Sequence, residues 1–79
     1  MKIGDIRISV FGWAINRMGH NDYISLIPGD VILVCSFEMH DEEVCTVIAE
    51  GNLGIVACRT LKSCTRTLDD QLILMKAGR

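Results

Sequence analysis

The sequence lacks a long apolar run and a strong charge of either sign. No apolar stretch approaches the ~18 residues that cross a membrane, and Lys2, Asp5 and Arg7 interrupt the N-terminal stretch where a secretory leader needs apolar residues. The formal net charge is only −2, with acidic and basic residues mixed along most of the chain. No broad positive field would therefore gather nucleic acid or anionic lipid. We expect a cytoplasmic protein with no membrane contact, and the charge disfavours nucleic acid as a partner.

Motifs for catalysis, cofactors and metals are also missing. No glycine-flanked nucleophile is present, and 79 residues leave little room to enclose a reaction. His40 lies beside three carboxylates at 41–43 that suit zinc, but the spacing of known zinc sites is absent, so a solvated acidic loop explains these residues better. We predict a non-enzymatic protein with no cofactor and no metal.

The sequence does contain enough apolar residues for one small core. They make up 49% of the 79 residues, which predicts a single domain over 1–79. The four cysteines show no two-residue spacing of a zinc or redox motif. Cys35, Cys45 and Cys58 lie inside apolar runs, so we predict that these three are reduced and buried.

Short strands separated by turn residues dominate the pattern. Ile6, Ile8 and Val10 alternate with polar residues, which predicts a strand with these three on one face. The segment 16–22 is rich in turn formers, and Pro28-Gly29-Asp30 predicts a tight turn. Further strands are expected over 23–26, 31–35, 44–48 and 54–58, with a loop at 38–43, a hairpin turn at 50–52 and a short connection around Leu61. Residues 68–75 fit a last strand or a short helix equally well.

The order of these elements resembles a Src-homology-3 domain. Ser9-Val10-Phe11-Gly12-Trp13 stands where that family has Ala-Leu-Tyr-Asp-Tyr. The segment 22–30 then matches the family's acidic residue, Leu-Ser-Phe and Gly-Asp. In the later hairpin, Val44-Cys45 falls on the family's Trp-Trp pair, and Gly54-Ile55-Val56-Ala57 falls on its Gly-Leu-Phe-Pro segment.

The resemblance implies an all-β fold. The expected structure is a small, five- to six-stranded Src-homology-3-like barrel whose core covers residues 8–61, followed by a short C-terminal extension over 62–79. The resemblance also places aliphatic residues at the core positions of the family. These are Val10, Ile24, Leu26, Val31, Leu33, Val47, Ile55 and Leu61.

The positions that bind peptides in this family are largely changed. Its members hold proline-rich helices between flat aromatic rings. Here the first tryptophan is Val44, the proline is Ala57 and the tyrosine is Thr60, whereas Phe11 and Trp13 keep aromatic rings. The lost rings would have supplied most of the contact area. The resemblance therefore implies the fold more strongly than the usual ligand, and a proline-rich peptide is disfavoured.

The predicted function is a protein–protein interaction module of the adaptor or inhibitor type, with another protein as its partner. Exposed aromatic residues beside a loop are typical interface anchors, which selects Phe11, Trp13 and Tyr23. Acidic loop residues could attract a basic partner and add Asp22, Glu42 and Glu43. Phe11 or Trp13 could instead fill the core, as a single tryptophan in a small protein often does.

Two further functions stay open. Five basic residues could meet phosphates in a nucleic-acid-associated barrel, namely Arg59, Lys62, Arg66, Lys76 and Arg79. The high apolar fraction could alternatively mark a face that is buried in a homo-oligomer. A steep loss of affinity with salt would indicate the first, and sedimentation as more than a monomer would indicate the second.

Overall fold

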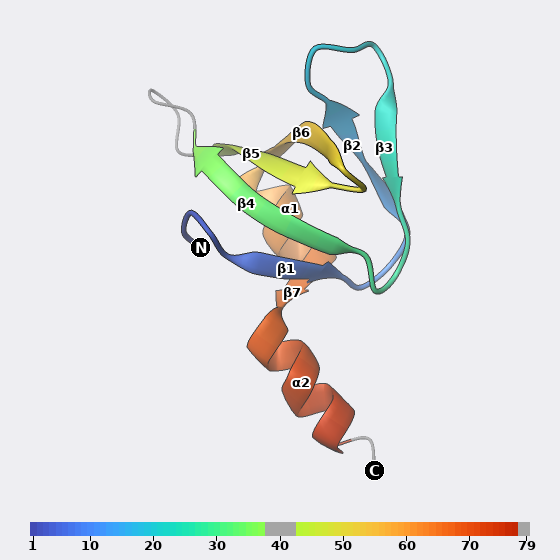
Figure 1. Ribbon diagram of the computed structural model, residues 1–79. Coiled ribbons are helices and arrows are strands. Elements are labelled where there is room, and N and C mark those ends of the chain that lie inside the picture. The colour runs from blue at the N-terminus through green and yellow to red at the C-terminus, as the bar shows by residue number, and fades with distance from the viewer. Residues whose placement is uncertain (38–42, 78–79) are drawn as a thin grey trace.

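Strands dominate the computed structural model, which describes residues 1–37 and 43–77, with the backbone alone at 74, 75 and 77 (Figure 1). The strands are β1 Ile6–Ser9, β2 Trp13–Arg17, β3 Tyr23–Leu26, β4 Val31–Phe37, β5 Val44–Ala49, β6 Asn52–Ala57 and β7 Thr65–Thr67. The helices are α1 Cys58–Cys64 and α2 Leu68–Ala77. The described part of the chain is therefore mostly β, with two short helices near its C-terminal end.

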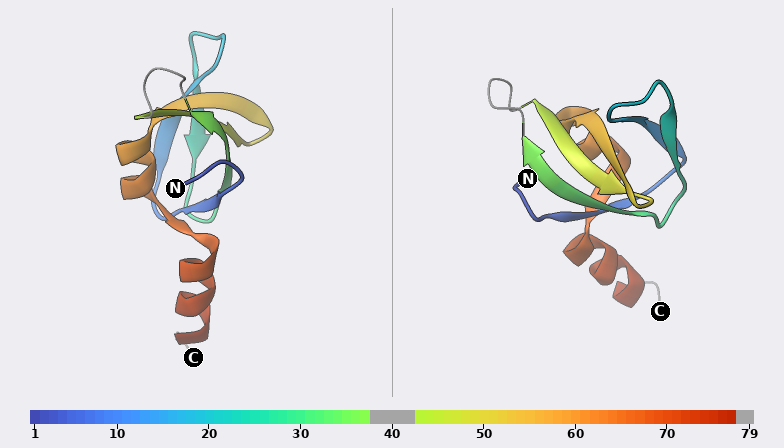
Figure 2. Two further views of the ribbon diagram at one scale, coloured as in Figure 1. Left: turned by 90° about the vertical axis from the view of Figure 1, so that its left-hand side faces the viewer. Right: turned by 45° about the horizontal axis from the view of Figure 1, so that its top comes forward.

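All seven strands belong to one antiparallel sheet. Their order across the sheet is β3-β2-β6-β5-β4-β1-β7, so β3 and β7 form the two edges. The sheet curls into a half-barrel, and α1 lies on its concave side (Figures 1 and 2). The expected count of five to six strands is too low, because β2 and β7 add to the strands that the sequence pattern predicts.

The core fills the space between the concave face of the sheet and α1. Leu61 of α1 is fully buried, which shows that the helix covers the inner side of the curl. The predicted core residues Ile24, Leu26, Val47 and Leu61 are confirmed as buried. The core cluster consists of Ile15, Ile24, Leu26, Ile32, Val34, Cys45, Val47, Ala49, Val56 and Leu61.

The predicted inward face of β4 is wrong. Val31 and Leu33 are 55% and 37% exposed, whereas Ile32 and Val34 are fully buried. Every position from 31 to 34 is aliphatic, so a period of two fits either face equally well. The pairing of β4 with its neighbours decides the register, and the sequence pattern of β4 alone does not contain that information.

The C-terminal segment contains two helices. One, α1, stands where the sequence predicted a short connection around Leu61, and the other, α2, covers residues 68–75, which fitted a strand or a helix equally well. Residues 58–64 form α1, and β7 follows within the segment assigned to the extension and pairs with β1. The side chain of Thr67 caps α2 by accepting a hydrogen bond from the backbone N–H of Asp70 at 3.1 Å. Asp69 and Asp70 in the first turn and Lys76 in the last turn complement the helix dipole. Neither helix in the described residues is long and apolar enough to span a membrane.

Candidate functional site

A groove of about 420 Å³ opens between β2 and β6. We call it the β2–β6 groove. Its lining comes from β2, β3, β5, β6 and the first turns of α1, and consists of Ala14, Ile15, Asn16, Tyr23, Val44, Ile55, Val56, Ala57 and Thr60. None of these side chains carries a charge at neutral pH. The groove is thus an apolar depression with a few polar groups, which is the usual composition of a binding site.

The groove exists because β2 stays beside β6 over a short distance only. β6 pairs with β5 along its whole length, but with β2 only through the pairs Asn16–Ile55 and Arg17–Gly54. Gly54 permits this close crossing. A Cβ atom at Gly54 would lie 2.8 Å from Cγ2 of Ile15 and 3.2 Å from the carbonyl oxygen of Asn16. Residues 13–15 of β2 pair with β3 alone, and the space that this leaves between β2 and β6 becomes the groove.

Tyr23 supplies the aromatic ring of the groove. Its side chain is 69% exposed, and Tyr23 lies directly opposite Asn16, which in turn lies opposite Ile55 on β6. Opposed residues of antiparallel strands point to the same face, so these three side chains form one row across the groove. Across the groove, the row presents the ring of Tyr23, the amide of Asn16 and the aliphatic side chain of Ile55 side by side. It can therefore contact both the apolar side chains and the polar backbone of a bound segment.

The three changed positions of the family resemblance meet in this same groove. Val44 at the start of β5, Ala57 at the end of β6 and Thr60 in α1 all line it. Val44 and Ala57 also lie opposite each other in the β5–β6 pair. Small side chains at these positions leave a smooth aliphatic depression without the flat ring pairs that separate proline-binding slots.

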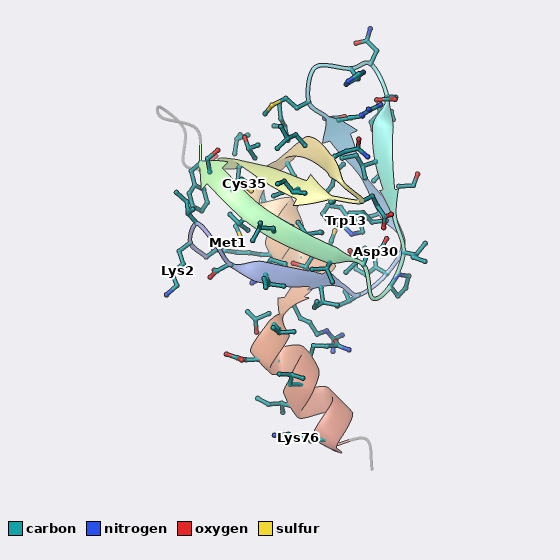
Figure 3. The ribbon with its side chains drawn as sticks, viewed as in Figure 1. Met1, Lys2, Trp13, Asp30, Cys35 and Lys76 are labelled. Atoms are coloured by element: carbon teal, nitrogen blue, oxygen red, sulfur yellow. The ribbon has the colours of Figure 1, made fainter. Side chains whose placement is uncertain are left out.

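Phe11 and Trp13 lie apart from the groove lining. Phe11 is 47% exposed in the connection between β1 and β2. Trp13 is half-buried, packs against the core, and donates a hydrogen bond from Nε1 to Oγ of Ser9 at 3.0 Å. Figure 3 shows Trp13 beside the turn that carries Asp30, and Asp30 itself accepts the backbone N–H of Ser9. Trp13 therefore fits the alternative of a core residue better than that of an exposed interface anchor, because it is half-buried and packs against the core.

Comparison with known proteins adds no relative. No family model, curated protein or solved structure matches this chain.

Two of the predicted acidic residues lie in different segments of the described chain. Asp22 ends the turn between β2 and β3, where its carboxylate lies 3.2 Å from Nη1 of Arg17. Glu43 is exposed just before β5, and its carbonyl oxygen accepts the backbone N–H of Cys58 at 2.6 Å. Glu42 lies outside the described residues, as does the rest of the predicted acidic loop. Asp22 lies next in sequence to Tyr23, which places its charge near the rim of the groove.

The cysteines are only partly as predicted. Cys45 and Cys64 are buried, Cys35 and Cys58 are half-buried, and no disulfide joins any of the four. Burial, followed by a hydrogen bond and charge interaction with Cys58, raises the pKa of Cys45 to about 12. Burial also raises the pKa of Cys64. Cys45 and Cys64 are therefore protonated packing residues at neutral pH.

Sequence reasoning missed the groove residues of β2. The sequence pattern predicts a turn-rich segment over 16–22, which includes Asn16, and no separate strand for Ala14 and Ile15, although Trp13 to Arg17 forms a strand. One signal was available. Two short stretches with β-type residues, 13–16 and 23–26, flank a turn-rich segment that contains Gly19, and this arrangement is typical of a hairpin.

Proposed function

We propose that this chain is a non-enzymatic protein-interaction module that holds an extended segment of a partner protein in the β2–β6 groove. The observation that carries the proposal is the groove itself, an uncharged and mainly aliphatic depression of about 420 Å³ with the exposed ring of Tyr23 along one side. Aromatic anchors beside apolar depressions are the features on which protein–protein contacts usually depend.

The Src-homology-3 resemblance supports the same location. That resemblance singled out Val44, Ala57 and Thr60 as the positions of a peptide groove, and these three residues line one depression. The long β2–β3 hairpin follows the first strand, as the long loop does in the order of elements that suggested the family. We infer a Src-homology-3-like arrangement whose binding surface has kept its place and changed its chemistry.

The groove favours an aliphatic segment over a proline-rich one. A polyproline helix gains affinity by packing its rings between flat aromatic side chains. The described groove contains one such ring, on Tyr23, and small side chains elsewhere. An extended segment with Val, Ile or Leu at alternate positions could place its apolar side chains on Ile55 and Val44 and its backbone near the Asn16 amide.

A peptide selection tests the proposal directly. A random peptide library displayed on phage is selected against the purified chain, and the affinities of the selected peptides are measured by isothermal titration calorimetry. We expect peptides rich in aliphatic residues. The Tyr23→Ala variant should bind them at least about 10-fold more weakly, because truncating an aromatic hot-spot residue typically costs about 2 kcal/mol or more.

Phe11→Ala is the matched control, since Phe11 is also an exposed aromatic residue but does not line the groove. It should leave the affinity within about 2-fold of the original value. Loss of binding in Phe11→Ala with full binding in Tyr23→Ala would move the site to the β1–β2 connection and end the groove proposal. Enrichment of proline-rich peptides would contradict the proposed ligand class.

A further inference from the structure

Four exposed aliphatic side chains form a row across the outer face of the sheet. Ile6 lies opposite Leu33, Leu33 lies opposite Ile48, and Ile48 lies opposite Leu53. Because directly opposed residues point to the same face, the four side chains follow one another from β1 to β6. Each is between 37% and 47% exposed. We call these four residues the outer row.

The last helix carries a second exposed apolar surface. Leu68, Leu72 and Ile73 are 41%, 46% and 63% exposed, and Leu68 and Leu72 lie one turn apart on the same side of α2. The helix contacts β1 and β7 and then extends away from the sheet (Figure 2). Figure 3 shows Lys76 at the end far from the sheet. An isolated helix of about 10 residues is marginal in water and needs its apolar side packed, so α2 calls for a partner surface.

The outer row and α2 adjoin at one crevice, which Asp5 and Asp69 also line, and their lengths are similar. Ile6, which begins the row, and Leu68, which begins the helix, line the same crevice. The row crosses three gaps between neighbouring strands, a length of about 14 Å. A helix of the length of α2 extends for about 15 Å. The helix of one molecule is thus long enough to cover the whole outer row of another.

The exposed area suits association between two copies. The seven side chains of the outer row and α2 together expose roughly 500 Å² of apolar surface, the upper end of what a monomer normally shows. A stable interface buries about 800 Å² per partner, of which about 65% is apolar in homodimers, so the two amounts agree. The outer row contains no charged side chain, and a net charge of −2 opposes self-association only weakly.

We propose that two copies of this chain form a two-fold symmetric dimer in which α2 of each copy lies across the outer row of the other. Each copy contributes the same two surfaces, as a two-fold interface requires. The dimer buries Leu68 and Leu72 of both helices and leaves the ring of Tyr23, on the β2–β3 hairpin, available to a further partner.

Sedimentation equilibrium over about 1–500 µM protein tests the dimer. The unchanged chain should show twice the monomer mass. Leu72→Lys and Ile48→Glu should each raise the dimer dissociation constant at least about 100-fold, because each substitution occurs twice in the interface. An equimolar mixture of the two variants should associate again. In the mixed dimer the new lysine faces the new glutamate in one contact, and the other contact keeps both original side chains.

Two controls separate this proposal from failure of the fold and from the proposed function. The far-ultraviolet circular dichroism of both variants should match that of the unchanged chain. Tyr23→Ala should leave the dimer intact, since Tyr23 lies on the edge strand β3, which β2 separates from β6, where the outer row ends. Three results would each overturn the proposed dimer. The unchanged chain could stay monomeric throughout the concentration range, both single variants could still dimerise, or the equimolar mixture of the variants could stay monomeric.

Discussion

Cys45 is a residue whose chemistry is set almost completely by its place in the fold. It is fully buried in β5, and its thiol lies 3.5 Å from the carbonyl oxygen of Val56. Burial shields the thiol from solvent, so the thiolate is poorly stabilised, and the neighbouring Cys58 adds to the effect. The sequence predicted burial of this thiol from its apolar neighbours. The same reasoning failed for Cys35, because position within an apolar run does not say which side of a strand faces the core, and for Cys58, which begins α1 instead of lying in a strand.

The raised pKa of Cys45 predicts a loss of stability at alkaline pH. The folded-state pKa of about 12 lies above the ordinary thiol value of about 8.5–9, so the unfolded chain releases its proton first. Stability is complete below about pH 9 and falls as the pH rises toward 12, by up to about 1.4 kcal/mol per pH unit. Urea unfolding between pH 8 and pH 11 measures this slope. Cys45→Ala should be less stable at pH 8 but should lose less stability with rising pH, and equal slopes in both proteins would contradict the assignment.

At the scale of elements, the β5–β6 hairpin turn was predictable and the register of strands was not. Gly51 marked the β5–β6 turn, and the adjoining strands agree with the structure within a residue or two. The seven residues of α1 were missed, since they contain no acidic residue in the first turn and no side-chain cap. Their helical form depends on burying Leu61 and Cys64 inside the curl, which is a tertiary effect. The groove was therefore only partly predictable. Val44 and Ile55 in its lining come from the predicted β5–β6 hairpin, whereas Thr60 comes from the unpredicted helix α1.

The β5–β6 turn contains a residue in an unfavourable conformation. Glu50 has a φ of 53° and Gly51 a φ of 74°, the pattern of a two-residue turn that favours Asn-Gly. Asp30 lies close to the Glu50 side chain, and repulsion between their charges raises the pKa of Glu50. Glu50→Asn should therefore raise Tm by roughly 4–8 °C, the change expected when a small domain gains modest stability. Glu50→Gln removes the charge but keeps the unfavourable φ, so it should raise Tm less. Equal Tm values for the two variants would show that repulsion alone matters.

At the scale of the whole molecule, the first and last strands meet through a buried arginine. Alternation placed Arg7 on the polar side of its strand, yet it is only 9% exposed, because it lies opposite the fully buried Ile32 and so faces the core side of the sheet. Nε of Arg7 donates to Oγ1 of Thr65 at 2.9 Å, and Nη2 donates to the carbonyl oxygen of Thr65 at 3.3 Å. Thr65 in turn donates to the carbonyl oxygen of Leu61 in α1. Arg7 and Thr65 are 58 positions apart in the sequence, so no local pattern could have predicted the contact between them.

Thr65→Val tests whether this connection holds the half-barrel together. The substitution keeps the shape of the side chain but leaves Nε of a buried guanidinium without its acceptor, which should cost about 2–3 kcal/mol in urea unfolding. Thr46→Val, on the outer face of β5, should change stability by less than about 0.5 kcal/mol. Arg7→Met removes the charge that needs an acceptor, so the double variant with Thr65→Val should lose about 1–3 kcal/mol less than the sum of the single losses. Losses that add within about 0.5 kcal/mol would mean that Arg7 and Thr65 contribute separately, and that packing alone joins the last strand to the first.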